Sequence, residues 1–306
     1  MASKDQGGTT TCPLCSSDDV TVLYSGSTAP VIDEHAAFRC TTNTLVRPEV
    51  LQCTPCGHVF SNPSTWPPSL SDAYQGLSDP DYLDVIHVKR RTFRRAADVV
   101  QRLSPPGGTL VEVGSYAGLF LDEMSRRGYT VMGVEPSQWG ADVARERGHN
   151  VIQGTIESLA EGIPGEPFDI VVSWDVLEHV EDPRAMMRTL ASWTKPGGVL
   201  VLSTLDRGNW FARRTGGRWP WIIPMHLHYF DQATVKSMAA DNGMVFLETG
   251  PHVHYTSVDY LAGKFIPTLA RRHEKPASRF REALNAMVFP VGFGDVRMFA
   301  FRRPAA

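Results

Sequence analysis

Four cysteines form the arrangement in this chain with the clearest chemical meaning. They occur as two clips of the form Cys-x-x-Cys, Cys12 with Cys15 and Cys53 with Cys56. Two residues between thiolates let one tight turn direct both sulfurs at one ion, and two such turns complete a closed tetrahedral zinc site. Residues 16–52 separate the clips, a longer interval than the roughly 15–20 residues usual in a zinc ribbon. The pattern predicts a structural zinc site, with four reduced thiols and no metal as the alternative.

A glycine turn follows an apolar stretch in the middle of the chain. Residues 112–118 read Glu-Val-Gly-Ser-Tyr-Ala-Gly. A dinucleotide fingerprint that starts at Gly114 needs glycine at positions 116 and 119, where the chain has tyrosine and leucine, and no Gly-Lys-Ser/Thr of a P-loop follows. What remains is an acid on a strand, then two glycines where backbone and ligand approach closely.

A second acid, Glu135, ends the next apolar stretch. At the carboxyl edge of a parallel sheet, such a carboxylate accepts hydrogen bonds from two ribose hydroxyls. The glycine turn alone is a weak signal. Together with Glu135 and the alternation of strand-like and helix-like stretches, it predicts a nucleoside-containing ligand at that edge.

The composition is that of a globular chain, with 306 residues, 42% hydrophobic content and a net charge of −3. That charge argues against a chain dedicated to nucleic acid. The first residues lack the apolar core of a signal peptide, and no apolar run approaches the length of a membrane span. The fifth cysteine, Cys40, has no partner if the others hold zinc. Unpaired thiols beside a zinc clip predict a reducing, cytoplasmic location.

The apolar pattern divides the chain into three regions. Residues 1–62 form the zinc module, and residues 63–104 form a helical linker that begins with prolines. From residue 105 to 306, strand-like and helix-like stretches alternate, with insertions near 206–230 and 251–294. Such alternation predicts the α/β class, a Rossmann-like parallel sheet covered by helices on both faces. Strands are expected at 109–113, 129–134, 150–153, 168–174, 199–203, 245–249 and 295–302, and helices at 117–127, 137–147, 182–194 and 232–242.

The chain resembles the class I S-adenosylmethionine-dependent methyltransferases over roughly residues 105–250 and the last strand, which implies a seven-stranded sheet. It is similar in particular to the bacterial branch with an N-terminal zinc-binding module, which includes sugar C-methyltransferases and methyltransferases of antibiotic and glycan pathways. The chain departs from the pattern at Tyr116, where glycine is usual, and at residues 203–206, where Thr-Pro-Asn is frequent. The matching segments are Leu110–Phe120, Gly133–Ser137, Phe168–Pro183, Lys195–Gly198 and His226–Phe230.

This resemblance implies S-adenosylmethionine as the cofactor and a small-molecule acceptor, such as a phosphorylated or nucleotide-linked sugar or a natural-product intermediate. The methyl group of a sulfonium is already activated, so the protein mainly positions two reactants and excludes water. Glu157 lies where the family often contacts the adenine amino group, although it also fits a solvated helix start. The residues expected to hold the cofactor are Glu112, Gly114, Tyr116, Gly118, Glu135, Trp174 and Asp175.

An acceptor that is a hydroxyl or an acidic carbon must also lose a proton, and histidine is the natural base near neutral pH. His226 best matches the histidine that the resemblance to sugar C-methyltransferases implies as the base. His228 faces the same side if the backbone is extended, and His179 follows the fourth strand of the sheet. Each of the three also fits a structural role, as a brace for a helix or as a donor to a backbone carbonyl.

Both insertions contain residues suited to the acceptor side. The aromatic loop 209–221 has three tryptophans together with Arg213, Arg214 and Arg218, which predicts either a phosphate-binding lid or a loop packed on the core. Residues 256–290 form a basic amphipathic stretch, suited to an anionic partner or to a solvated face.

Two other functions remain open. One is a zinc-ribbon nucleic-acid methyltransferase, against which the acidic balance and the lack of an aromatic-basic stripe argue. The other is a cofactor-binding regulatory protein without catalysis, against which the intact glycine turn and several candidate bases argue.

Overall fold

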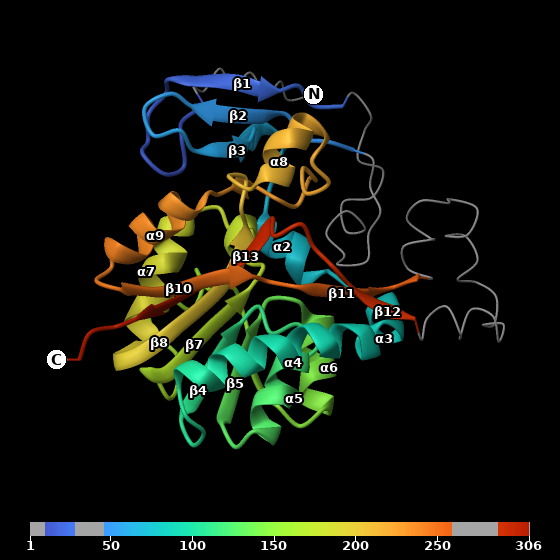
Figure 1. Cartoon of the computed structure of the whole chain (residues 1–306), viewed down its shortest axis with the longest axis vertical. Helices are drawn as coiled ribbons and strands as arrows, with labels where there is room; N and C mark the ends of the chain where they lie inside the picture. The colour runs from blue at the N-terminus through green and yellow to red at the C-terminus, as the bar shows by residue number, and fades with distance from the viewer. Residues whose placement is uncertain (1–9, 28–45, 259–286, 306) are drawn as a thin grey trace, which may run out of the picture.

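The computed structural model describes residues 10–27, 46–258 and 287–305, and its centre is a seven-stranded sheet (Figure 1). The strand order is β10-β13-β8-β7-β4-β5-β6; the strands from β8 to β6 are parallel, and β13 is antiparallel to β8 and β10. The predicted α/β class is thus confirmed. The strands are β4 (Thr109–Val113), β5 (Thr130–Glu135), β6 (Asn150–Gln153), β7 (Phe168–Trp174), β8 (Thr194–Leu205), β10 (Val245–Pro251) and β13 (Val296–Arg302).

Helices cover both faces of this sheet because its inner strands are apolar on both sides. On β4, Leu110 packs with α4 and α5, whereas its neighbour Val111 packs with the cluster that includes Met187 of α7. Asp182 caps α7 by accepting from the backbone N–H of Ala185 at 2.9 Å. The helices on one face are α4 (Ile86–Leu103), α5 (Leu119–Arg126) and α6 (Gln138–Glu146), and those on the other are α7 (Pro183–Trp193) and α9 (Gln232–Ala240) (Figure 1).

The linker before β4 is a series of short elements rather than one long helix. A 3-10 turn, η1 (Pro63–Thr65), leads to α2 (Leu70–Gln75) and α3 (Asp81–Asp84), and α4 follows. The helical stretch is interrupted between α2 and α3, where Gly76 and Pro80 lie, because proline cannot continue a preceding helix.

The N-terminal region forms a second sheet with the order β1-β2-β3-β9. Its strands are β1 (Val20–Tyr24), β2 (Val50–Cys53), β3 (Val59–Ser61) and β9 (His228–Tyr229). The last strand comes from the predicted insertion near 206–230, so residues distant in sequence complete the sheet. Phe60 of β3 also belongs to the same buried cluster as Phe230 and Val235, which joins the cysteine-bearing region to the large sheet.

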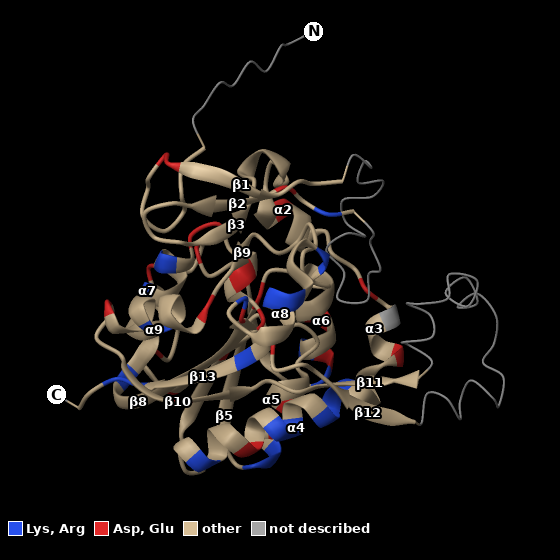
Figure 2. Ribbon diagram, turned by 45° about the horizontal axis from the view of Figure 1, so that its top comes forward, with Lys and Arg blue, Asp and Glu red and all other residues tan. Residues whose placement is uncertain are grey.

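The second insertion contributes a two-stranded sheet of β11 (His254–Ser257) and β12 (Val288–Val291). Cys40 and the basic residues Lys264, Arg271, Arg272, Lys275, Arg279 and Arg281 lie outside the described residues. Figure 2 shows Lys and Arg along α4. Two of these arginines, Arg90 and Arg102, form ion pairs with Asp122 and Glu248. No helix in the described part of the chain is long and apolar enough to cross a membrane.

Candidate functional site

The glycine turn joins β4 to α5 in a left-handed path. Gly114 has φ +77°, Tyr116 has φ +44° and Gly118, which caps α5, has φ +73°. A Cβ at position 114 would lie 2.5 Å from Cγ2 of Val176, so both the torsion and the close contact require glycine there. A tyrosine at positive φ is an uncommon, strained conformation, which concentrates at ligand-binding turns.

Glu135 closes the turn from the end of β5. One carboxylate oxygen accepts from the backbone N–H of Tyr116 at 2.7 Å, and the other accepts from that of Ser137 at 2.8 Å. Each oxygen keeps a second acceptor position. Burial raises the pKa of Glu135 to about 7, although both backbone donors favour the ionised form. The side chain is therefore placed to receive two vicinal hydroxyls.

Two polar atoms beside the turn are buried without a partner in the described structure. They are the Oε2 of Glu112 and the Oγ of Ser115. Burial, together with the charge of Glu135, raises the pKa of Glu112 well above its usual value. Buried polar atoms are normally hydrogen-bonded. A polar ligand at this position would supply the hydrogen bonds that these two atoms lack within the protein. The unpartnered atoms of Glu112 and Ser115 are therefore available to a polar group of a ligand.

Aromatic rings line the turn on the side of α6. The ring of Tyr116 lies edge-on to Tyr82, with centroids 4.7 Å apart, and 5.4 Å from the ring of Trp139. A Cβ at Gly140 would lie 3.2 Å from the Tyr116 ring. These rings, set at steep angles to one another, form an apolar wall next to the Glu135 carboxylate. Glu157, the alternative adenine contact, is exposed.

Asp175 follows β7 at the same edge of the sheet, since β4 and β7 are paired in parallel. Its φ is +53°, and its Oδ1 accepts from the Ser203 hydroxyl at 2.6 Å. Its Oδ2 lies 3.3 Å from Nε2 of His254 and 4.0 Å from Nε2 of His252. Burial alone would raise the pKa of Asp175, but these histidines and Ser203 hold it below its usual value.

His179 and His226 lie next to each other near Asp175. Their ring centroids are 4.9 Å apart. Nδ1 of His179 donates to the Met225 carbonyl at 2.8 Å, and Nδ1 of His226 donates to the Trp221 carbonyl at 2.7 Å. Because a carbonyl only accepts, each neutral ring keeps its lone pair on Nε2. Burial lowers the pKa of His179 to about 4, and burial with the neighbouring His179 lowers that of His226 to about 3.

His179, His226, His252 and His254 around Asp175 form what we call the histidine cluster. Its second pair was missed from the sequence because the interpretation of the insertion near 251–294 rested on the basic stretch 256–290, which begins after both histidines. The signal was present as His-x-His at the start of β11, since alternate residues of an extended chain face the same side. Glu178 was also missed. It is 1% exposed, it accepts from the Thr204 hydroxyl, and burial with the charge of Asp175 raises its pKa to about 8.

His228 has different partners, contrary to the expectation that it faces the same side as His226. It lies in β9, and its side chain is fully buried. Nε2 donates to the Val180 carbonyl at 2.9 Å, and Nδ1 lies 3.1 Å from Nε2 of His58. Only His228 belongs to β9, and the N–H of Leu227, between the two histidines, donates to the Glu178 carbonyl at 2.8 Å. With both nitrogens paired, His228 fits the structural role.

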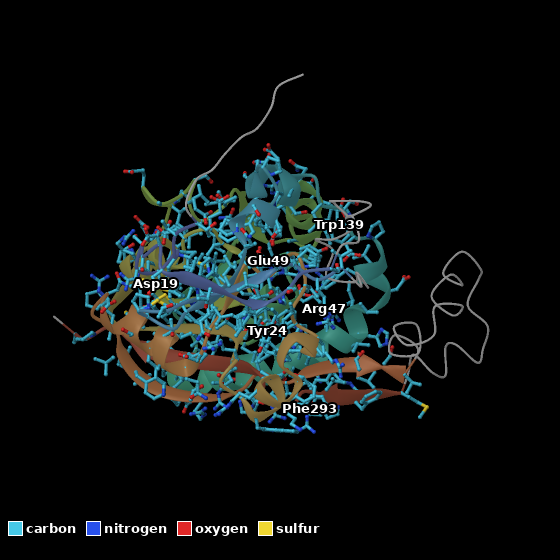
Figure 3. All side chains as sticks on the ribbon, turned by 90° about the horizontal axis from the view of Figure 1, so that it is seen from above. Asp19, Tyr24, Arg47, Glu49, Trp139 and Phe293 are labelled. Atoms are coloured by element: carbon cyan, nitrogen blue, oxygen red, sulfur yellow. The ribbon has the colours of Figure 1, made fainter. Side chains whose placement is uncertain are left out.

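The aromatic loop packs against the protein through two of its tryptophans. Nε1 of Trp219 and Nε1 of Trp221 both donate to Oδ2 of Asp295, at 2.8 Å and 3.0 Å. Arg47, which Figure 3 shows near Tyr24 on the N-terminal side, donates to the Gly217 carbonyl of the loop at 2.7 Å. These contacts favour a loop packed on the core over a lid. The arginines of the loop, Arg213, Arg214 and Arg218, are exposed.

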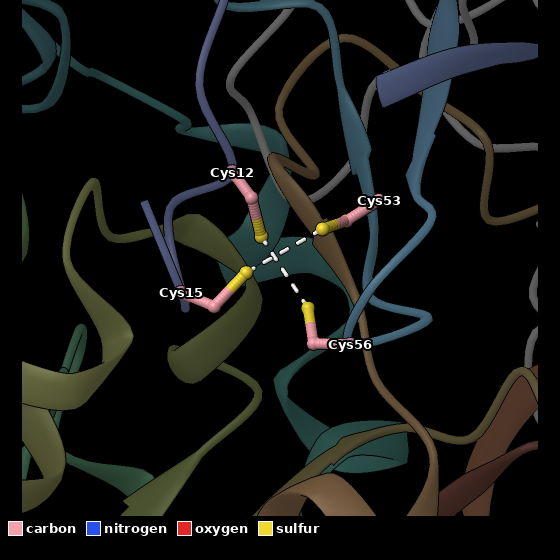
Figure 4. Close-up of side chains that lie close together, drawn as sticks. All are labelled: Cys12, Cys15, Cys53 and Cys56. Carbon is pink, nitrogen blue, oxygen red and sulfur yellow. Dashed lines mark hydrogen bonds between the residues drawn. The ribbon is translucent and has the colours of Figure 1, made fainter. Parts of the chain in front are cut away.

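The four clip cysteines converge (Figure 4). Sγ of Cys12 lies 3.6 Å from that of Cys56, and Sγ of Cys15 lies 3.4 Å from that of Cys53. All four sulfurs lie within 4.8 Å of one another. Zinc–sulfur bonds of about 2.3 Å place tetrahedral sulfurs roughly 3.8 Å apart, close to this spacing. The donor set therefore fits a closed zinc site.

The turns that present the cysteines are alike. The N–H of Ser16 donates to the Cys12 carbonyl, and the N–H of Gly57 donates to the Cys53 carbonyl, both at 2.9 Å. Ser16 has φ +59° and Gly57 has φ +71°, so each clip ends in a left-handed residue. At the second clip this position is a glycine, the residue that adopts positive φ most readily.

Two cavities in the described part of the chain lie away from the glycine turn. One of about 310 Å³ lies between α4 and β10, with Arg95, Arg102 and His252 in its lining. Another of about 90 Å³ lies under the aromatic loop, next to Tyr24 and Trp219. At the turn itself the aromatic wall packs closely, so the site is identified by its unpaired polar atoms and backbone geometry rather than by a large void.

Known proteins match the same part of the chain. Residues 88–249, more than half of the 306 residues, match the family described as methyltransferase domain. A ubiquinone biosynthesis O-methyltransferase of Bradyrhizobium sp. (strain ORS 278) is 39% identical over 123 residues, which cover 39% of this chain and 47% of that protein. The enzyme of that name from Rhodopseudomonas palustris (strain BisB18) is 35% identical over 152 residues, 46% of this chain and 58% of the relative.

The chain thus spans about half the length of the curated relatives it matches. The names of these relatives do not support the closer resemblance to sugar C-methyltransferases. Among solved structures, magnesium protoporphyrin IX methyltransferase of Synechocystis PCC 6803 is similar, with 18% identity, a TM-score of 0.47, and 74% of this chain and 89% of that chain covered. On the family match, which covers the sheet from β4 to β8 and the glycine turn, the chain belongs to the methyltransferase-domain family.

Proposed function

We propose that this protein transfers a methyl group from S-adenosylmethionine to a small-molecule acceptor. The observation that carries the proposal is the position of Glu135 and the strained glycine turn at the same sheet edge as the histidine cluster. Bound S-adenosylmethionine supplies a methyl group that is already activated. The chain's own residues then bind and orient the cofactor and the acceptor, and they exclude water.

Binding of the cofactor is assigned to the residues around the turn. Glu135 receives the ribose hydroxyls on its two remaining acceptor positions, and Gly114 and Gly118 let the backbone approach the ligand. Glu112, with an unpartnered buried oxygen, is suited to a cationic ammonium group. Trp174 and Asp175 form the end of the cofactor site that lies next to the acceptor.

The acceptor that we propose carries a hydroxyl group. The relatives named above are O-methyltransferases of ubiquinone biosynthesis, which favours a hydroxylated aromatic compound. The resemblance seen in the sequence favours a sugar or natural-product intermediate, and the exposed Arg213, Arg214 and Arg218 suit a phosphate or nucleotide on such a compound. A nucleic-acid acceptor is not expected, because the chain is acidic overall.

His226 is the proposed base for the acceptor proton. Its Nδ1 is fixed by the Trp221 carbonyl, which leaves Nε2 as the acceptor atom. His179, whose Nδ1 also lies 3.0 Å from the Tyr74 hydroxyl, is the second candidate. His228 is the third, and its paired nitrogens make it the weakest of the three.

The function is tested by mass spectrometry of acceptor panels incubated with the protein and S-adenosylmethionine. Phenols, sugar phosphates and nucleotide sugars form separate panels, with RNA as a fourth. Gain of one methyl group by a phenol or sugar, with equal formation of S-adenosylhomocysteine, is expected. Tight cofactor binding without transfer to any panel in a single turnover would support the regulatory alternative instead.

The acid Glu135 makes cofactor affinity dependent on pH. Burial raises its pKa to about 7, and the ionised form is the better acceptor for ribose hydroxyls. Affinity for S-adenosylmethionine is therefore expected to fall as the pH drops through that value, by at most about tenfold per pH unit. Calorimetry at several pH values around 7 measures this affinity. The Glu135→Gln variant should bind weakly without that dependence, and an equal slope in both proteins would contradict the assignment.

We also propose that Cys12, Cys15, Cys53 and Cys56 hold a structural zinc ion. Metal analysis is expected to find about one firmly bound zinc per chain, lost in Cys53→Ser. Removal of the ion should speed hydrogen exchange in β1–β3 more than in β4–β8, because zinc binding contributes to folding of its own module. A metal-free preparation with native exchange rates throughout would exclude the zinc site.

A further inference from the structure

Asp175 follows β7, and its side chain lies close to those of His254 in β11 and of His252, which lies between β10 and β11. Oδ2 of Asp175 lies 3.3 Å from Nε2 of His254 and 4.0 Å from Nε2 of His252. The three ligand atoms lie within 4.8 Å of one another. Two imidazoles and one carboxylate are a ligand set for a divalent transition-metal cation.

The contact between Asp175 and His254 is not a hydrogen bond. Although its 3.3 Å separation is short, Nε2 of His254 is buried and has no hydrogen-bond partner in the described part of the protein. Ligands bound at about 2.0–2.2 Å to one ion stand roughly 3–3.5 Å apart. The two atoms thus lie within hydrogen-bond distance but without hydrogen-bond geometry, and their separation suits two ligands of one shared cation.

The surroundings hold these ligands in place. Ser203 donates to Oδ1 of Asp175 at 2.6 Å and so leaves Oδ2 for the histidines. The ring of His252 stacks on Trp174, with centroids 5.4 Å apart and planes 8° from parallel. Hydrogen bonds and packing that orient the ligands in this way are a regular feature of metal sites. The side chains of Asp175 and His254 are 29% and 26% exposed, which leaves a side for an ion to enter.

We propose that Asp175, His252 and His254 bind a divalent transition-metal cation such as Zn²⁺, Mn²⁺ or Co²⁺, whose open positions take the hydroxyl oxygen of the acceptor. This inference rests on the proposed function, and it adds a bound cation that positions the acceptor. Nitrogen ligands favour such ions over Mg²⁺, which prefers oxygen. Three protein ligands leave room for the acceptor, as in catalytic rather than structural sites.

The cation also accounts for the weakness of the histidine base. With a pKa of about 3, His226 is a poor base for an ordinary hydroxyl. An ion that binds the acceptor oxygen lowers the pKa of that hydroxyl. The proton then passes to Nε2 of His226, and the oxygen lone pair forms the new bond to the methyl carbon while the sulfur keeps the electrons of the bond that breaks.

The test uses the full chain with its cysteine site already filled with zinc. Co²⁺ is added, and its binding is followed by visible absorption and by equilibrium dialysis. The wild type is expected to take up about one Co²⁺ per chain, with d–d bands but no thiolate charge-transfer band, because the ligands are nitrogen and oxygen. His254→Asn should weaken uptake by roughly 100-fold or more, beyond the 10–100-fold effect of an outer-shell change.

Three further variants make the result specific. His87→Asn changes an exposed histidine on α4 and should bind Co²⁺ as the wild type does. His252→Asn should behave as His254→Asn does, and calorimetry with S-adenosylmethionine shows whether each variant is folded. Glu178→Gln tests the neighbouring trio of Glu178, His179 and His226, whose ligand atoms also lie within 4.8 Å of one another.

The inference is overturned if the wild type takes up no Co²⁺ beyond its zinc, if His254→Asn takes up as much as the wild type, or if uptake is lost only in Glu178→Gln. These results do not depend on methyl transfer. Cofactor binding and transfer without any Co²⁺ uptake would refute the cation site alone. Co²⁺ uptake without transfer to any acceptor would refute the proposed function alone.

Discussion

Replacing His226 with alanine is expected to lower turnover by roughly 10²–10⁴-fold while affinity for S-adenosylmethionine stays near the wild-type value. The ring lies in the histidine cluster, away from Glu135, and its Nε2 keeps the lone pair because Nδ1 donates to Trp221. Loss of this nitrogen removes the acceptor for the proton. Turnover with a saturating acceptor and calorimetry with the cofactor measure the two quantities.

His226→Asn is the sharper variant. The asparagine amide keeps a donor for the Trp221 carbonyl, so the loop retains its hydrogen bond while the base is lost. It should be as slow as His226→Ala and more stable to heat. His228→Ala should show the opposite result, a loss of stability with smaller loss of turnover, because both ring nitrogens are hydrogen-bonded in a buried position.

The pH profile provides a further check on the role of His226. Its pKa of about 3 means that the ring stays neutral far into the acidic range. Turnover is measured against pH with a saturating cofactor. Protonation of His226 should therefore not be the cause of any decline in turnover near neutral pH. A large loss only in His179→Ala would assign the proton to His179. If neither histidine variant is slowed, positioning alone carries the reaction, as with an acceptor that is already a nucleophilic amine.

Replacing Glu135 with alanine is expected to weaken binding of S-adenosylmethionine by about 2–3 kcal/mol, since hydrogen bonds to a charged group contribute about 1.5–3 kcal/mol each and are not fully additive. Two effects combine. The ribose hydroxyls lose their acceptor, and the backbone N–H groups of Tyr116 and Ser137 lose the carboxylate that holds the turn. Calorimetry with the cofactor and with S-adenosylhomocysteine measures the change.

Glu146→Ala is the matched control, because Glu146 lies exposed at the end of α6, the helix that follows Glu135. It should bind the cofactor as the wild type does. Unchanged affinity in Glu135→Ala, or tight binding of NADH to the wild type, would overturn the assignment of the cofactor. Thermal unfolding of both variants without ligand separates loss of contact from loss of structure.

Much of the large sheet was predictable because its signals are local. The strand predicted at 168–174 is β7 to the residue, since a buried parallel strand is a short, continuous apolar run. Helix ends followed capping residues and glycines, as at Asp182 and Gly148. The predicted strand at 199–203 begins earlier, at Thr194, because backbone pairing with Phe168 extends it through a segment that reads as a turn.

The sequence by itself determined the class of the fold, the glycine turn, Glu135 and the cysteine clips, because each depends on residues close together in the chain and on fixed spacing. Only the tertiary structure decided that β9 completes the N-terminal sheet and that His228 belongs there with His58. It also brought His252 and His254 to Asp175 across some 80 residues of chain. Such long-range pairing follows from which surfaces bury one another, and no local pattern of residue types encodes it.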